Sequence, residues 1–138
     1  MSKPFRLVIL DDELQTAKDL AASLSSDGVV AYPTQDLDEV RELISLLQHD
    51  VLLIDVEQLV RAPIYALQAL RQVNPDLKVV GMSHGSCGDG RLLRELLGLD
   101  AYLQEPVTPE ALITCVPEIA DRYLMVSFKK VLDKSSNL

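Results

Sequence analysis

The sequence has 138 residues, of which 48% are hydrophobic and 25% charged, and its formal net charge is −8. This length suits one domain with one hydrophobic core. Binding to a nucleic-acid backbone depends on lysine and arginine, so 13 basic residues against 21 acidic ones argue against nucleic-acid binding by this chain. No run approaches the roughly 18 apolar residues of a membrane span.

The N-terminus leads directly into a strand-like run without a cleavage site, which argues against a secretory signal. Cys87 and Cys115 have no CxxC spacing. We therefore expect reduced thiols in a cytoplasmic protein.

Short apolar runs alternate with helical patterns along the chain. The predicted strands are 6–10, 29–32, 51–54, 78–82 and 101–104. The first, third and fourth of these runs are continuously apolar, as in strands that are covered on both faces of a parallel sheet.

Helical patterns follow the first two strands. One begins at Leu14, and Gly28 is placed to end it. The next begins with Asp36 as N-cap and Glu39 three residues later, which is the spacing of a capping box.

Three more helical patterns follow. Pro63 can occupy the first turn of a helix that ends before Asn74, and the run GRLLRELLG supplies the next one. Thr108 and Pro109 are typical of the N-cap and first turn of a last helix, which Pro117 should kink or end.

Five strand–helix units in a row predict an α/β fold with a doubly wound parallel sheet. In the commonest order, 2-1-3-4-5, strands one and three are neighbours and flank the switch point. Ligands of such sheets bind at the carboxyl ends of the strands.

Carboxylates follow two of these strands. The first strand runs into Asp11 and Asp12, and the third runs into Asp55. At about 5 Å and an effective dielectric constant near 20, each pair of carboxylates costs roughly 3 kcal/mol, which a hard cation such as Mg²⁺ would offset. The alternative is that Asp11 and Asp12 only favour the start of the helix at Leu14 through its dipole.

Four segments, ILDDE, LLIDV, GMS and AYLQEPVTPEAL, together resemble the motifs of a response-regulator receiver domain. The order of the motifs, and the spacing from Asp55 to Ser83 and Glu105, are more specific than any one motif. The resemblance implies a flavodoxin-like receiver domain over residues 1–120 that works in a phosphorelay.

By this resemblance, Asp55 accepts a phosphoryl group from a histidine kinase or phosphotransfer protein. Asp12 would bind Mg²⁺ directly, Asp11 would bind it through water, and the backbone carbonyl of Glu57 would complete the ligands contributed by the protein together with Asp55. A receiver catalyses only its own phosphorylation and dephosphorylation, so we expect no conventional enzyme activity.

The resemblance also assigns the parts that switch. Ser83 would follow the phosphoryl group and couple it to Tyr102 on the fifth strand. The family has a cis peptide before the proline of its fifth strand, so the bond from Glu105 to Pro106 is a cis candidate.

Three positions depart from the family. Receivers have a lysine where this chain has Glu105, and the change of sign turns attraction to a phosphoryl group into repulsion. His84 replaces a small residue, and VEQLVRAP after Asp55 predicts a differently built loop. We expect phosphorylation that is slow, short-lived or weakly coupled to a change of shape.

Two other functions fit the same residues. A pseudo-receiver would keep the fold and serve as an interaction module that does not depend on phosphorylation. A Mg²⁺-dependent phosphohydrolase would use Asp55 as its nucleophile, although Glu57 stands where such enzymes usually have a second aspartate.

We predict a helical extension for the C-terminal segment 121–138, separate from the receiver-like domain. Ala120, Leu124, Phe128 and Val131 form an apolar stripe at helical spacing. It would be a linker helix toward an output domain or the partner in a homodimer, or else a longer final helix that packs on its own domain.

Overall fold

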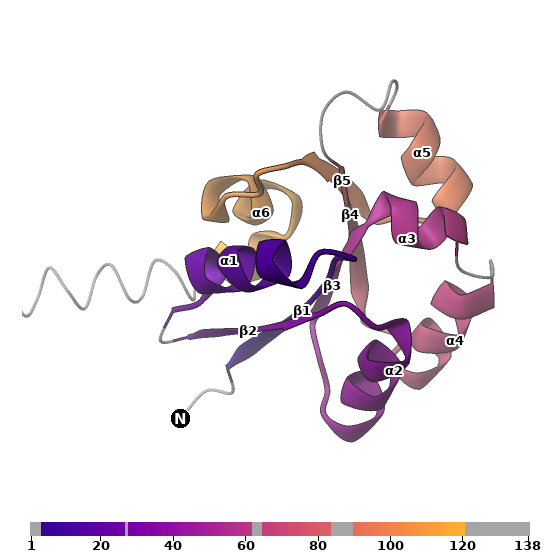
Figure 1. Ribbon diagram of the computed structural model, residues 1–138, viewed down its shortest axis with the longest axis horizontal. Coiled ribbons are helices and arrows are strands. Elements are labelled where there is room, and N and C mark those ends of the chain that lie inside the picture. Colours follow the sequence, from indigo (N-terminus) through magenta and orange to yellow (C-terminus); the bar gives the residue numbers. More distant parts are fainter. Residues whose placement is uncertain (1–3, 27, 62–64, 84–89, 121–138) are drawn as a thin grey trace, which may run out of the picture.

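The computed structural model describes residues 4–26, 28–61, 65–83 and 90–120 (Figure 1). Its strands are β1 (Phe5–Leu10), β2 (Val29–Thr34), β3 (Val51–Asp55), β4 (Lys78–Ser83) and β5 (Ala101–Gln104). They form one sheet in the order β2-β1-β3-β4-β5, and every neighbouring pair is parallel. The predicted fold class and strand order are confirmed. Outside the described residues lie the predictions at Pro63, His84, Cys87 and 121–138.

Helices cover both faces of the sheet (Figure 1). They are α1 (Leu14–Leu24), α2 (Leu37–Leu46), α3 (Val56–Arg61), α4 (Tyr65–Val73), α5 (Gly90–Leu97) and α6 (Pro109–Cys115), followed by the 3₁₀ turn η1 (Pro117–Ile119). Residues of α1, α6 and η1 share one hydrophobic core with the sheet, and residues of α2 and α4 share the other. Among the described residues, no helix is both long enough and apolar enough to cross a membrane.

The alternation of side chains along a strand explains why the central strands are apolar throughout. Leu7 and Ile9 of β1 enter the core under α1, whereas Val8 and Leu10 enter the core under α2. All four side chains are fully buried. Burial of each such side chain stabilises the fold by about 1.5–3 kcal/mol, so a polar residue inside β1 would be costly on either face.

Two predicted caps are confirmed. The carboxylate of Asp36 accepts the backbone N–H of Asp38 at 2.9 Å, at the start of α2. The hydroxyl of Thr108 accepts the backbone N–H of Ala111 at 3.1 Å, at the start of α6. The last helix ends before Pro117, as expected.

The predicted end of the first helix is wrong. Helix α1 ends at Leu24, and Ser25 is its C-cap in an extended conformation. Gly28 lies beyond the helix, where its carbonyl accepts the N–H of Phe5 at 2.9 Å and starts the pairing of β1 with β2.

The predicted loop after Asp55 is also wrong. The first six residues of this stretch form the helix α3, which begins directly after β3. They contain neither proline nor glycine, and the carboxylate of Asp55 accepts the N–H of Glu57 at 3.0 Å, as an N-cap residue does. Local capping therefore favours a helical turn there.

Candidate functional site

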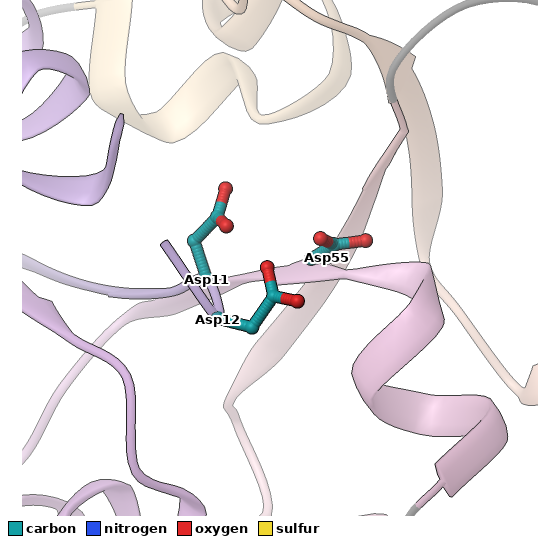
Figure 2. A group of neighbouring side chains, drawn as sticks. All are labelled: Asp11, Asp12 and Asp55. Atoms are coloured by element: carbon teal, nitrogen blue, oxygen red, sulfur yellow. The ribbon is translucent and has the colours of Figure 1, made fainter. Parts of the chain in front are cut away.

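Asp11 and Asp55 lie side by side because they follow the same pairing of strands. Leu10 of β1 pairs with Ile54 of β3. The residues that follow them, Asp11 and Asp55, therefore lie next to each other at the carboxyl edge of the sheet. Asp12 comes one residue later, and carboxylate oxygens of all three residues lie within 4.8 Å of one another (Figure 2). The predicted cluster of carboxylates is present.

The two carboxylates at the strand ends are buried and anchored in the same way. Asp11 is 1% exposed and Asp55 is 3% exposed, whereas Asp12 is exposed. Oδ1 of Asp11 accepts the backbone N–H of Glu13 at 3.0 Å, which matches the bond from Glu57 to Asp55. Oδ2 of Asp11 is buried and accepts no hydrogen bond within the described part of the chain.

Burial raises the pKa of Asp11 above its ordinary value, because desolvation disfavours the charged carboxylate. The hydrogen bond from Glu13 opposes this rise, while the neighbouring carboxylates of Asp12 and Asp55 add to it. Negative charge is therefore poorly compensated at this edge of the sheet.

These donors fit a hard divalent cation. All are carboxylate oxygens, which Mg²⁺ prefers, and Oδ2 of Asp11 is a buried acceptor that a cation or its water would satisfy. Opposite ligands of a Mg²⁺ ion lie about 4.2 Å apart, since each Mg–O bond is about 2.1 Å. The spread of 4.8 Å within the cluster is close to that span.

The backbone carbonyl of Glu57 stays a predicted ligand. Glu57 lies in the first turn of α3, which begins directly after Asp55.

Ser83 and Tyr102 are in contact across two strands. Ser83 ends β4 next to β3 and is 2% exposed. Its hydroxyl is hydrogen-bonded to the hydroxyl of Tyr102, which lies on β5. The ring of Tyr102 packs against the core under α2, so a change at Ser83 can reach that core through one contact.

Glu105 has its backbone at the same edge but lies outside the carboxylate cluster. Its N–H donates to the carbonyl of Ser83 at 2.8 Å. It belongs to the lining of a cavity of about 380 Å³ between α1 and the segment after β5, together with Asp19 and Leu20. Within the described part of the chain, this cluster of carboxylates consists of Asp11, Asp12 and Asp55 and does not include Glu105. The peptide bond before Pro106 is cis, as predicted.

Sequence reasoning missed two parts of this region. One is the anchoring of Asp11 and Asp55 by the N–H groups of Glu13 and Glu57. Aspartate side chains commonly accept the backbone N–H two residues later, so this anchoring could have been predicted at each strand end. The other is the cavity beside Glu105. Its α1 wall consists of Thr16, Asp19, Leu20 and Ser23, which recur at the spacing of one helical face.

No model of a protein family matches the sequence, and a search of curated proteins gives no match. Solved structures do match. A response regulator from Thermotoga maritima superposes with a TM-score of 0.67 at 20% identity, covering 86% of this chain and 98% of that one.

Two further structures agree with this match. A putative response regulator from Chloroflexus aurantiacus has a TM-score of 0.66 at 23% identity, covering 85% of this chain and 98% of that one. A response-regulator receiver domain protein from Clostridium thermocellum has a TM-score of 0.64 at 19% identity, covering 88% and 98%. At these identities the likeness establishes the fold.

Proposed function

We propose that this chain, which has the fold of a response-regulator receiver domain, is a cytoplasmic receiver module that accepts a phosphoryl group on Asp55. Mg²⁺ would be held by Asp11, Asp12 and Asp55. One observation carries the proposal: two buried, anchored carboxylates and a third exposed one bring oxygens within 4.8 Å of one another at the carboxyl edge of the sheet.

In the transfer step, one oxygen of Asp55 attacks the phosphorus of the donor. The bond from phosphorus to the donor's leaving group breaks as the new P–O bond forms. The N–H of Glu57 holds Oδ1 of Asp55 and so orients the carboxylate for this attack. Mg²⁺, when bound, supplies positive charge to the phosphoryl oxygens, as in other phosphoryl transfers.

The hydroxyl of Ser83 is the switching group in this proposal. It is at the end of β4, next to the strand that carries Asp55, and can donate to a phosphoryl oxygen. Its hydrogen bond to Tyr102 would then break, which would free the tyrosine to change position. The donor would be a histidine kinase or phosphotransfer protein, and segment 121–138 would lead to an output domain or a homodimer partner.

Glu105 is the reason to expect weakened switching. A carboxylate at the end of β5 cannot pair with a phosphoryl group, and this one belongs to the cavity beside α1. The same observation favours a second candidate function, an interaction module that does not depend on phosphorylation. In that case the carboxylate cluster would persist without accepting a phosphoryl group.

Incubation with acetyl phosphate and Mg²⁺, followed by intact-mass measurement, separates the two functions. The proposal predicts a gain of about 80 Da, the mass of one phosphoryl group, in the wild-type chain but not in Asp55→Asn. The variant Asp76→Asn is the matched control, because this exposed carboxylate lies elsewhere and should leave the gain intact. An unchanged wild-type mass would favour the interaction module.

A further inference from the structure

Two surface patches, one acidic and one basic, lie at the two edges of the sheet, and exposed apolar side chains occur near each of them. β2 and β5 are the outermost strands. The first patch joins β2 to α2, and the second joins α5, which packs on β5, to the end of α4. Figure 1 shows β2 and α5 at opposite ends of the molecule. Neither patch belongs to the site proposed for phosphorylation.

The acidic patch lines a cavity of about 370 Å³ beside β2. It contains the carboxylates of Asp36, Asp38, Glu39 and Glu42, with Tyr32 and Leu46 among them. The side chain of Leu46 is 78% exposed and that of Tyr32 is 43% exposed. Apolar groups this exposed, surrounded by charges of one sign, are typical of a surface that binds another protein.

Little positive charge compensates the acidic patch. Arg41 forms an ion pair with Asp38 at 3.7 Å, and both side chains are well exposed to water. Such a pair contributes little to stability. The cavity therefore keeps a net negative charge.

The basic patch surrounds a larger cavity, of about 620 Å³, beside α5. Arg71, Arg91 and Arg94 line it, with Glu95 and Asp100 as the acidic members. The carboxylate of Asp100 is already engaged, because it accepts from Arg71 at 3.1 Å and from the N–H of Val79 at 2.8 Å. Three arginines against two carboxylates leave the patch with a surplus of one positive charge, in a chain whose net charge is −8.

Helix α5 also carries two exposed leucines, which are not part of the lining of this cavity. Leu92 is 54% exposed and Leu96 is 72% exposed. Because they are four residues apart on α5, they form one stripe on its surface. Helix α5 therefore offers exposed apolar side chains as well as part of a cavity in which positive charges outnumber negative ones.

We propose that the acidic patch of one copy of this chain binds the basic patch of a second copy. The net charges of the two patches are opposite. The contact would also cover the exposed Tyr32 and Leu46 of the acidic patch. Each patch would repel its own kind, so a two-fold contact between identical patches is disfavoured. Since the patches are on opposite edges, each copy keeps one of them open and the contact extends head to tail.

Sedimentation velocity of the full chain tests the contact, over a range of concentrations at low and high salt. The proposal predicts a weight-average sedimentation coefficient that rises with protein concentration and exceeds the value expected for a dimer. Raising the salt reverses this rise, because the screening length falls from about 30 Å at 0.01 M to about 3 Å at 1 M. A coefficient that stays at the monomer value at low salt, or that levels off at the dimer, overturns the proposal.

Charge reversal identifies the surfaces. Glu39→Lys/Glu42→Lys makes both patches positive, and Arg91→Glu/Arg94→Glu makes both negative, so each variant alone should weaken association by about tenfold or more. Mixing the two variants in equal amounts restores complementary pairs and should restore association. Variants that associate like the wild type, or a mixture that does not recover, contradict the contact.

The control is Asp19→Lys/Glu110→Lys. It changes the net charge by the same amount as the first variant but alters exposed residues of α1 and α6, which line neither patch. It should associate like the wild type. If it weakens association as much as Glu39→Lys/Glu42→Lys does, net charge rather than the two patches governs the effect. The variant Asp55→Asn should also associate normally, which separates this contact from the phosphoryl proposal.

Discussion

At the scale of single residues, Asp11 and Asp55 owe their orientation to the backbone two positions ahead. Each uses one oxygen to accept an N–H and keeps the other for the site. A carboxylate held in this way loses little conformational freedom when it binds a cation or attacks phosphorus. The cost is the burial of charge, together with repulsion among the carboxylates, and both raise the pKa of Asp11.

His49 gives a prediction about pH. It is 5% exposed, and its Nδ1 is 2.8 Å from the carbonyl oxygen of Leu47, to which it must donate. Burial lowers the pKa of His49 below 6.5, an effect that Leu47 and Asp50 partly oppose and Arg6 reinforces. Between the lowered pKa and 6.5 the unfolded chain binds more protons than the folded chain. The contribution of His49 to the free energy of unfolding is therefore fully present above pH 6.5. It is lost as the pH falls from 6.5 through the pKa of His49 in the folded chain.

An NMR titration of the imidazole signals checks this prediction directly. The chain has two histidines, so the variant His84→Gln assigns the remaining signal to His49. Urea unfolding between pH 5 and 8 should show a smaller loss at low pH in His49→Gln than in the wild type. A His49 signal that titrates at 6.5 or above would contradict the prediction.

Glu105→Lys tests whether the acidic residue after β5 weakens switching. A lysine there can extend toward a phosphoryl group on Asp55 and pair with it. Each 1.4 kcal/mol gained would slow loss of the phosphoryl group about tenfold. The half-life of the phosphorylated chain, followed by intact mass after removal of acetyl phosphate, should lengthen by about that factor or more. Glu105→Gln, which removes the charge without reversing it, should fall between the two, and equal half-lives for all three chains would refute the role given to Glu105.

At the scale of elements, the close approach of neighbouring segments to β4 depends on Gly81. A Cβ at this position would lie 2.6 Å from Cδ1 of Leu99 and 3.0 Å from Cγ1 of Val56. Val56 begins α3, and Leu99 precedes β5, so the glycine makes room for two connections at once.

Gly81→Ala should therefore destabilise the fold. Both contacting atoms are at the ends of side chains that can shift, so we expect about 1–2 kcal/mol, with a larger loss for Gly81→Val. Urea unfolding measures both values. Unfolding free energies within about 0.5 kcal/mol of the wild type for both variants would show that α3 and the segment before β5 have more room than the structure indicates.

The elements also show what the sequence could predict. Short apolar runs identified all five strands. The runs that are continuously apolar belong to β1, β3 and β4, the three central strands, which helices cover on both faces. Helix α3 escaped prediction because six residues are too few for a periodic pattern. The end of α1 was predicted too late because Gly28 does not end the helix. Its carbonyl instead accepts the N–H of Phe5, where β1 begins to pair with β2.

At the scale of the whole molecule, the strand order determines which residues meet. The order 2-1-3-4-5 brings Asp11 and Asp55 together, and this was predictable from the position of each at the end of a strand. The cavity beside Glu105 was not, because its walls depend on how α1 packs against the segment after β5. The acidic and basic patches likewise combine elements that are distant in sequence.

The repulsion among three carboxylates should make the stability of the whole fold depend on Mg²⁺. A ligand that binds only the folded state stabilises it by RT ln(1 + [L]/Kd), or about 1.4 kcal/mol at ten times its Kd. In Asp11→Asn, the loss of one charge should raise the stability of the metal-free chain and remove most of the response. Asp76→Asn, which leaves the cluster intact, should respond like the wild type.

Thermal unfolding by calorimetry, with EDTA and then with increasing Mg²⁺, is the most direct test of the cluster formed by Asp11, Asp12 and Asp55. We predict that the wild-type Tm rises by a few degrees with a saturable dependence on Mg²⁺, and that Asp11→Asn starts higher and changes little. A wild-type Tm that Mg²⁺ leaves unchanged, or an equal rise in Asp11→Asn, would contradict the assignment of this edge of the sheet as a cation site.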